Sequence, residues 1–228
     1  YDADIVLIGD SVGRQITTKL LSDQAMAARF PGMTFSNLTT NQAIEITGQY
    51  YLIRRYLKRN KKPTAILFIG LNPLGRNLDQ IFTENFVKRC FTNFHEIAEI
   101  ASHKGIGFAF DMFMYKFFPS YRYRLRLQNK ILRFRNSAYM GQEWALQANS
   151  KKKNESSPAA FSTSALSNIY FVRLVDLLSR EGISFYFLPA PLKKSTYEHE
   201  NAKKRITFMK DFFHALEKKY PNFHFIDE

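Results

Sequence analysis

Cysteine is almost absent from this chain of 228 residues, which contains only Cys90. A single cysteine excludes an intramolecular disulfide and any cysteine-rich metal site. No apolar run reaches the roughly 18 residues that a membrane-spanning helix needs, and no signal peptide opens the chain. The chain starts at Tyr1 rather than Met and enters an apolar run almost at once. We therefore interpret it as a processed or cloned fragment, in which a missing targeting segment does not argue for a cytosolic location.

Acidic residues are also scarce: 20 Asp and Glu stand against 33 Lys and Arg, which gives a net charge of +13. Such a charge favours a partner or surface of opposite sign, namely nucleic acid, anionic lipid headgroups or an acidic glycan. The hydrophobic content of 45% is typical of a globular domain. The 22 Phe and 12 Tyr indicate aromatic surface for binding as well as packing. No nucleotide-binding loop or metal-ligand cluster is visible, so we expect no cofactor and no metal.

Apolar runs alternate with stretches of helical periodicity along the chain. This alternation predicts an α/β fold with a parallel sheet and helices on both faces. Residues 111–164 do not fit it and are interpreted as a basic helical insertion in a single domain that spans residues 1–228. The predicted strands are 4–8, 33–38, 65–69, 106–110, 183–188 and 223–226, and the predicted helices are 12–29, 43–60, 78–104, 166–180 and 201–219.

The carboxyl ends of parallel strands share one edge of a sheet, where ligands gather. Gly9-Asp10-Ser11 follows the first predicted strand, and Gly70-Leu71-Asn72-Pro73 follows the third. A serine at the start of a helix has an exposed hydroxyl, and the helix N-terminus favours negative charge that develops nearby. Ser11 is therefore a candidate nucleophile. The alternative is that Asp10 or Ser11 only caps the helix.

Two of these segments carry a family resemblance. The apolar strand that leads into Gly9-Asp10-Ser11 is similar to the first sequence block of the SGNH (GDSL-type) hydrolases, and the strand that leads into Gly70-Leu71-Asn72 resembles their third block. The resemblance implies a three-layer α/β/α, flavodoxin-like fold. It also implies that Ser11 is the nucleophile and an oxyanion donor, and that the Asn72 side-chain amide is a second oxyanion donor.

The other two family blocks are altered or missing. The stretch from Asn37 to Gln42 stands where the second block supplies a glycine N–H, but it has no glycine, which leaves the backbone of Asn41 or of Gln42 as the third donor. The only Asp-x-x-His in the chain, Asp211 to His214, lies inside the predicted helix 201–219 and not after the last predicted strand, where the fourth block stands. We expect the family's pair in residues beyond Glu228. Among the five histidines only His199, after the Pro189-Ala190-Pro191 strand end, stands at the expected sheet edge.

The insertion combines basic and aromatic residues, including Tyr121, Arg122, Tyr123, Arg124 and Arg126. Three interpretations stay open: a surface helix on an anionic membrane, a platform for a sugar chain or single-stranded nucleic acid, and a solvated lid. No nucleic-acid-binding motif accompanies the insertion, so nucleic acid is the least expected partner.

By this resemblance the chain is expected to be a serine-dependent esterase or O-acetyltransferase, with a carbohydrate or acyl-ester substrate. Bacterial members with a long insertion and an altered second block often resemble surface-polysaccharide O-acyltransferases and deacetylases, which implies an extracytoplasmic location. A single cysteine is equally compatible with the cytoplasm. The competing hypothesis is an inactive SGNH scaffold that binds an anionic glycan or a membrane surface.

Overall fold

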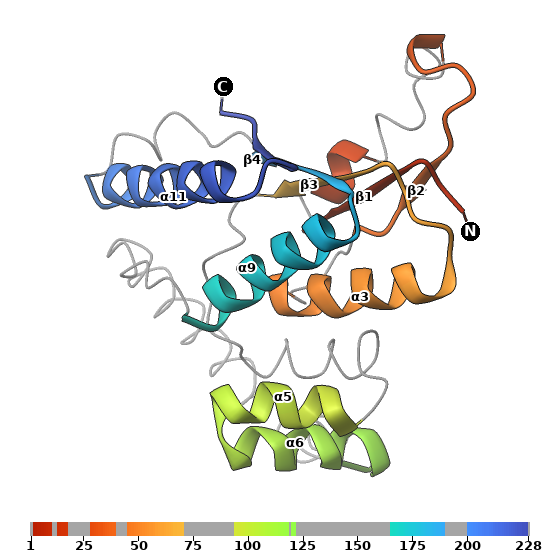
Figure 1. Cartoon of the computed structure of the whole chain (residues 1–228). Coiled ribbons are helices and arrows are strands. Elements are labelled where there is room, and N and C mark those ends of the chain that lie inside the picture. The colour runs from red at the N-terminus through yellow and green to blue at the C-terminus, as the bar shows by residue number, and fades with distance from the viewer. Residues whose placement is uncertain are drawn as a thin grey trace, which may run out of the picture. The chain divides into compact units, whose positions relative to one another are not determined.

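A computed structural model describes residues 2–10, 13–17, 28–39, 45–70, 94–118, 120–121, 165–189 and 200–227. Two compact units divide the chain: residues 1–86 with 162–228, and residues 87–161. The first unit contains the sheet, and the second contains the helices α5 (Phe94–Lys104) and α6 (Ile106–Phe117) (Figure 1). No helix in the described parts of either unit is both long and apolar enough to cross a membrane.

A five-stranded, all-parallel sheet forms the centre of the first unit, which confirms the α/β prediction. The strand order is β2-β1-β3-β4-β5, so the order reverses between β1 and β3, as in flavodoxin-like sheets. The short apolar runs form these strands because both of their faces are covered. The bounds are β1 (Ile5–Gly9), β2 (Phe35–Asn37), β3 (Ala65–Gly70), β4 (Ser184–Pro189) and β5 (Phe223–Phe225).

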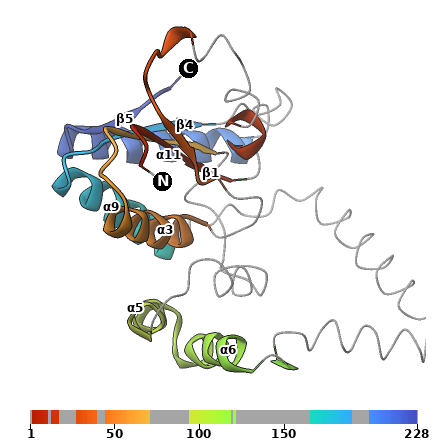
Figure 2. The ribbon, with the colours of Figure 1, turned by 90° about the vertical axis from the view of Figure 1, so that its right-hand side faces the viewer.

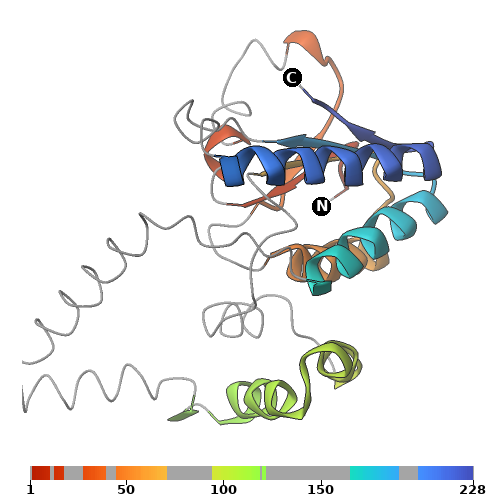
Figure 3. The same cartoon turned by 90° about the vertical axis from the view of Figure 1, so that its left-hand side faces the viewer.

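One face of the sheet packs against α3 (Glu45–Arg59), α9 (Ala165–Arg180) and α11 (Glu200–Lys219). Phe185 and Phe187 are two residues apart on β4, so they share one face of the sheet, and both rings contact Phe171 of α9. Phe213 of α11 contacts Phe171 at 5.1 Å and Phe187 at 4.7 Å between ring centroids. Figure 3 shows α11 running along the sheet. Part of the large phenylalanine content therefore forms the core between this face and the helices.

The opposite face receives the first helix. Ile69 alternates with Phe68 on β3, so its side chain lies on the face opposite α9. A Cβ on Gly13 would lie 3.4 Å from the Cβ of Ile69, which places the helical residues 13–17 on that face. Helices thus cover both faces of the sheet.

Helices α3 and α9 lie side by side under the sheet (Figure 2). The hydroxyl groups of Tyr51 and Tyr170 form a buried hydrogen bond of 2.9 Å between the two helices. At the end of α9, Gly182 has a φ of +69°. The N–H of Ile183 donates to the carbonyl of Leu178 at 2.9 Å. This is a Schellman motif, which requires the left-handed conformation that glycine adopts freely and which turns the chain directly into β4.

One predicted strand was wrong. Residues 106–110 were expected to extend the sheet, but Ile106–Phe117 is an α-helix that follows Gly105. The apolar alternation in Ile106-Gly107-Phe108-Ala109-Phe110 resembles a strand over five residues. Over twelve residues the apolar positions follow the helical period, and this longer pattern is the one that the structure adopts.

Candidate functional site

The two segments that resemble the SGNH blocks begin on adjacent strands of the sheet. Gly9 of β1 is paired in register with Ile69 of β3, so the residues that follow them meet at one edge. A Cβ on Gly70 would lie 3.2 Å from Oδ2 of Asp10. Gly9, Asp10 and Gly70 therefore lie together at one edge of the sheet. Ser11 and Asn72, the candidate catalytic residues, lie outside the described residues.

Glycine is required where β1 and the first helix meet β3. Gly9 has a φ of +151°, and a Cβ there would lie only 2.0 Å from the carbonyl oxygen of Ile69. A Cβ on Gly13 would lie 2.1 Å from the same oxygen. Both positions therefore exclude a side chain, and the helix start approaches the β3 backbone closely. The role of Gly13 was not recognised in the sequence, although a glycine in the first turn of a predicted helix was a signal, because glycine is a poor helix former.

Asp10 is the N-cap of the first helix. Its Oδ1 accepts a hydrogen bond from the N–H of Gly13 at 3.1 Å, and its carbonyl accepts from the N–H of Arg14 at 2.9 Å. Capping was the alternative to a chemical role, and for Asp10 it is what the structure shows. The helix N-terminus carries partial positive charge, and it lies at the sheet edge. The sequence places Ser11 directly after this cap.

A buried amide supports the same strand end from α3. Gln49 is 2% exposed, and its Nε2 donates to the carbonyl oxygen of Gly9 at 2.9 Å. Its Oε1 is buried and has no hydrogen-bond partner among the residues that the structure describes. The sequence did not reveal Gln49, because Ile46, Tyr50, Ile53 and Leu57 recur at helical spacing and indicate an apolar face that leaves Gln49 out. The buried positions instead include Gln49 and Tyr56, which lie one residue earlier than Tyr50 and Leu57.

The segment after β2 starts from a small polar network. The Nδ2 of Asn37 donates to Oγ1 of Thr17 at 3.1 Å, which links β2 to the first helix. The Oδ1 of Asn37 accepts from the N–H of Thr39 at 3.0 Å and from its hydroxyl at 2.6 Å. This network anchors the beginning of the stretch that was compared with the second family block. Asn41 and Gln42 themselves lie outside the described residues.

The two described histidines of the sheet unit, His214 and His224, make their contacts with residues other than Gly9, Asp10 and Gly70. His95 and His103 are exposed on α5, and His214 of α11 contacts Glu217 at 2.9 Å. His224 stacks on Tyr186 with a centroid distance of 4.8 Å. His199, the one histidine expected at the sheet edge, lies outside the described residues.

The basic aromatic insertion is described only at its beginning. Tyr121 is helical and half-buried. Arg122, Tyr123, Arg124 and Arg126 lie outside the described residues. Within the described ranges, no group of three or more His, Cys, Asp or Glu side chains is arranged to hold a metal ion.

Comparison of the chain with protein-family models, curated proteins and solved structures finds no match.

Proposed function

We propose that this chain is a serine-dependent acyl-ester hydrolase or O-acetyltransferase of the SGNH type that acts on a carbohydrate. In this proposal the Ser11 hydroxyl attacks the ester carbonyl, an Oγ–acyl bond forms and the ester C–O bond breaks. A general base takes the serine proton and returns it to the leaving alcohol. Water or a sugar hydroxyl then accepts the acyl group from Ser11.

The observation that carries the proposal is the contact between the ends of β1 and β3. Asp10 lies against Gly70, so the two segments that resemble SGNH blocks leave the sheet at the same point. This point is also where the strand order reverses, and doubly wound sheets bind ligands at that position. The helix N-terminus capped by Asp10 would favour the oxyanion of an acyl-transfer intermediate.

The carbohydrate substrate is supported by charge. A net charge of +13 favours an anionic polymer, and an acidic or acetylated glycan of a bacterial cell surface meets that condition. Tyr121, Arg122, Tyr123, Arg124 and Arg126 are the proposed glycan-binding residues, and the enzyme would act outside the cytoplasm. Aromatic rings and guanidinium groups suit stacking on sugar rings and pairing with carboxylates.

The test is labelling with a fluorophosphonate probe, which reacts with activated serines. It should be run on the 228-residue chain and on a form that extends past Glu228, because the only Asp-x-x-His of residues 1–228, Asp211 to His214, lies within α11 and not after β5, the last strand. We expect labelling that Ser11→Ala abolishes. Asn72→Ala should lower hydrolysis of an acetyl ester by about 10²- to 10³-fold, the usual effect of one lost oxyanion donor.

Two variants of Asp10 separate capping from chemistry. Asp10→Asn keeps the acceptor for the N–H of Gly13, whereas Asp10→Ala loses it. We expect Asp10→Asn to retain labelling, with stability close to that of the wild type, and Asp10→Ala to lose about 1 kcal/mol. If neither the 228-residue chain nor the extended form is labelled by the probe, while both bind an acidic glycan, the chain is a binding scaffold and the catalytic proposal is wrong.

A further inference from the structure

One face of α6 presents a continuous apolar stripe to solvent. The stripe consists of Ile106, Phe110, Phe113 and Phe117, which follow one another at intervals of four, three and four residues and so share one face of the helix. Ile106 is 88% exposed and Phe110 is 58% exposed. Met112 of the same helix is fully buried, which shows that α6 also has an inward face. The exposed stripe is therefore additional to the residues that pack the helix.

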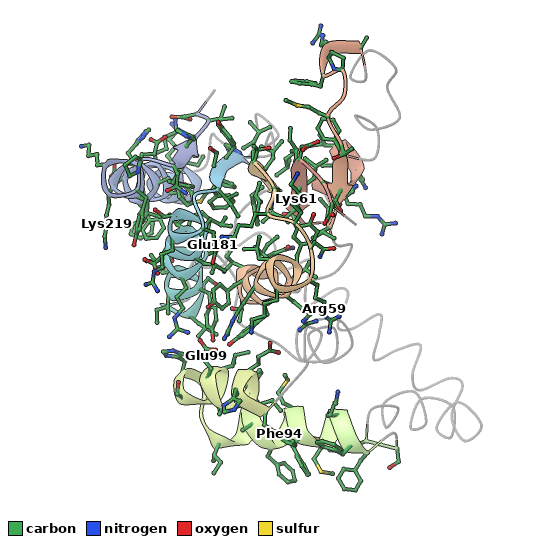
Figure 4. The ribbon with its side chains drawn as sticks, turned by 45° about the vertical axis from the view of Figure 1, so that its right-hand side comes forward. Arg59, Lys61, Phe94, Glu99, Glu181 and Lys219 are labelled. Atoms are coloured by element: carbon green, nitrogen blue, oxygen red, sulfur yellow. The ribbon has the colours of Figure 1, made fainter. Side chains whose placement is uncertain are left out.

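The stripe extends onto α5 and past the end of α6. Phe94 of α5 stacks on Phe117, with a centroid distance of 5.6 Å and an interplanar angle of 14°. Phe113 contacts both Phe117, at 4.8 Å, and Phe118, at 6.2 Å. Figure 4 shows Phe94 and the aromatic side chains that project from α6. Large exposed apolar patches on a protein surface mark interaction sites.

Charge distinguishes between possible occupants of this surface. Residues 105–135 contain one acidic residue, Asp111, and seven basic ones: Lys116, Arg122, Arg124, Arg126, Lys130, Arg133 and Arg135. A second copy of the chain on the stripe would bring two such cationic segments together, which like-charge repulsion opposes. A bilayer with anionic headgroups attracts the cations, and phenylalanine and isoleucine can bury in the acyl boundary below them.

We infer that the stripe of α6, with Phe94 and Phe118, docks on an anionic membrane surface. The helix would lie in the plane of the bilayer interface, with Ile106, Phe110, Phe113 and Phe117 inserted and Lys116 at headgroup level. The attachment is peripheral, and it uses residues other than those of the candidate site at the ends of β1 and β3. It does not depend on whether Ser11 is a nucleophile.

Co-sedimentation with vesicles tests the inference directly. The 228-residue chain should bind phosphatidylcholine vesicles that contain phosphatidylglycerol, and should bind pure phosphatidylcholine much more weakly. The variant Ile106→Asp/Phe110→Asp changes two exposed side chains, so the fold should survive. We expect it to weaken partitioning by at least about tenfold, because burial of two large apolar side chains is lost.

A matched control separates insertion from simple charge attraction. Phe208 on α11 is 45% exposed and lies outside the stripe, so the double variant Thr207→Asp/Phe208→Asp adds the same two charges elsewhere. Thr207 lies next to Phe208 on α11, and its hydroxyl donates only to the carbonyl of Lys203 among the described residues. If this control weakens binding as much as the stripe variant does, charge alone explains binding and the insertion is disproved.

A fluorescence measurement gives a second, independent readout. Trp144, the only tryptophan, is replaced by Phe, and a new tryptophan is placed in the stripe as Phe113→Trp or on α11 as Phe208→Trp. Brominated lipids should quench the tryptophan of Phe113→Trp and leave that of Phe208→Trp unquenched. The inference is overturned if both tryptophans are quenched equally, or if the wild type does not bind vesicles. It is also overturned if the wild type is a dimer that Ile106→Asp/Phe110→Asp dissociates, because the stripe would then bind a second copy of the chain.

Discussion

Gly13 approaches Ile69 so closely that a Cβ on Gly13 would lie 2.1 Å from the Ile69 carbonyl oxygen. The oxygen belongs to the backbone of β3 and cannot turn away as a side chain can. The helix that follows β1 can therefore start at the sheet edge only because residue 13 has no side chain. The same carbonyl excludes a Cβ at Gly9. The approach of the Ile69 carbonyl therefore requires glycine both before Asp10, at Gly9, and after Ser11, at Gly13.

Gly13→Ala should destabilise the protein by about 2 kcal/mol, a typical effect of overpacking. Helix propensity alone predicts the opposite sign, since alanine exceeds glycine by about 1 kcal/mol in a helix. The sign of the change in unfolding free energy, measured with urea, therefore decides between the two effects. A stabilised Gly13→Ala would show that the close approach to Ile69 does not exist.

Gly107 provides the matched control. It is also a helical glycine, in the first turn of α6, but a Cβ there would meet nothing within 4 Å. Gly107→Ala should be neutral or stabilise by up to about 1 kcal/mol. Destabilisation by Gly107→Ala comparable with that of Gly13→Ala would mean that the loss at Gly13 is not specific to Ile69.

The strands that could be predicted from the sequence are those whose burial is visible as a continuous run of apolar residues. The runs at Ile5–Gly9, Ala65–Gly70 and Ser184–Pro189 are continuously apolar because helices cover both faces of the sheet, and each was recognised within a residue or two. The adjacency of Gly9 and Gly70 also followed, because parallel strands that each carry a turn motif end at the same edge.

The features that were missed depend on contacts between distant residues. Gln49 is buried because the carbonyl of Gly9, forty residues away, accepts its hydrogen bond, and no local pattern contains that information. The strand predicted at 106–110 failed for a different reason. The exposed stripe of α6 has the apolar content of a buried strand, and the sequence alone does not show which apolar residues face solvent.

Removing the amide of Gln49 should expose how much it supports the end of β1. Gln49→Met keeps the length of the side chain but leaves the Gly9 carbonyl without the donor at 2.9 Å. We expect a loss of about 1–3 kcal/mol in the free energy of unfolding. A variant as stable as the wild type would show that the hydrogen bond contributes nothing.

Gln49→Glu adds a dependence on pH. A buried carboxylate beside the Gly9 carbonyl oxygen is unfavourable, so the pKa of the introduced glutamic acid should be raised in the folded state. The protonated acid can donate to Gly9, so the variant should be most stable below the unfolded pKa of about 4.3 and lose stability as pH rises above it. Urea unfolding at several pH values should show this trend for Gln49→Glu and a constant deficit for Gln49→Met. A pH-independent Gln49→Glu would contradict the burial of this position.

The hydrogen bond between Tyr51 and Tyr170 should appear as a coupling energy. Both rings are fully buried, and the hydroxyl oxygens are 2.9 Å apart. Tyr51→Phe and Tyr170→Phe should each cost about 1 kcal/mol, and the double variant should cost less than their sum, because the second change removes a hydroxyl that has already lost this partner. Combining Tyr51→Phe with Tyr220→Phe at the end of α11 should be additive. Additivity in the Tyr51–Tyr170 cycle as well would rule out a coupled pair.

Asp4 should make stability depend on pH through its hydrogen bonds to Thr34. Its Oδ2 accepts from the backbone N–H of Thr34 at 2.9 Å and from the Thr34 hydroxyl at 2.8 Å. These bonds, with a smaller contribution from the charge of Lys61, hold the pKa of Asp4 below its ordinary value. A lowered pKa means that the charged form stabilises the fold above the unfolded pKa of about 3.9, and that this stability is lost as pH falls through the folded pKa.

Asp4→Asn should therefore be less stable than the wild type at neutral pH, and the difference should shrink as pH is lowered below about 3.9. Urea unfolding of both proteins across this range measures the difference. Thr34→Val serves as the control on the cause: it removes the hydroxyl donor, so the pKa of Asp4 should rise toward its ordinary value in an NMR titration of the carboxyl carbon. A gap between wild type and Asp4→Asn that stays constant down to acid pH would show that protonation of Asp4 is not linked to folding, and that the two hydrogen bonds to Thr34 do not favour the carboxylate.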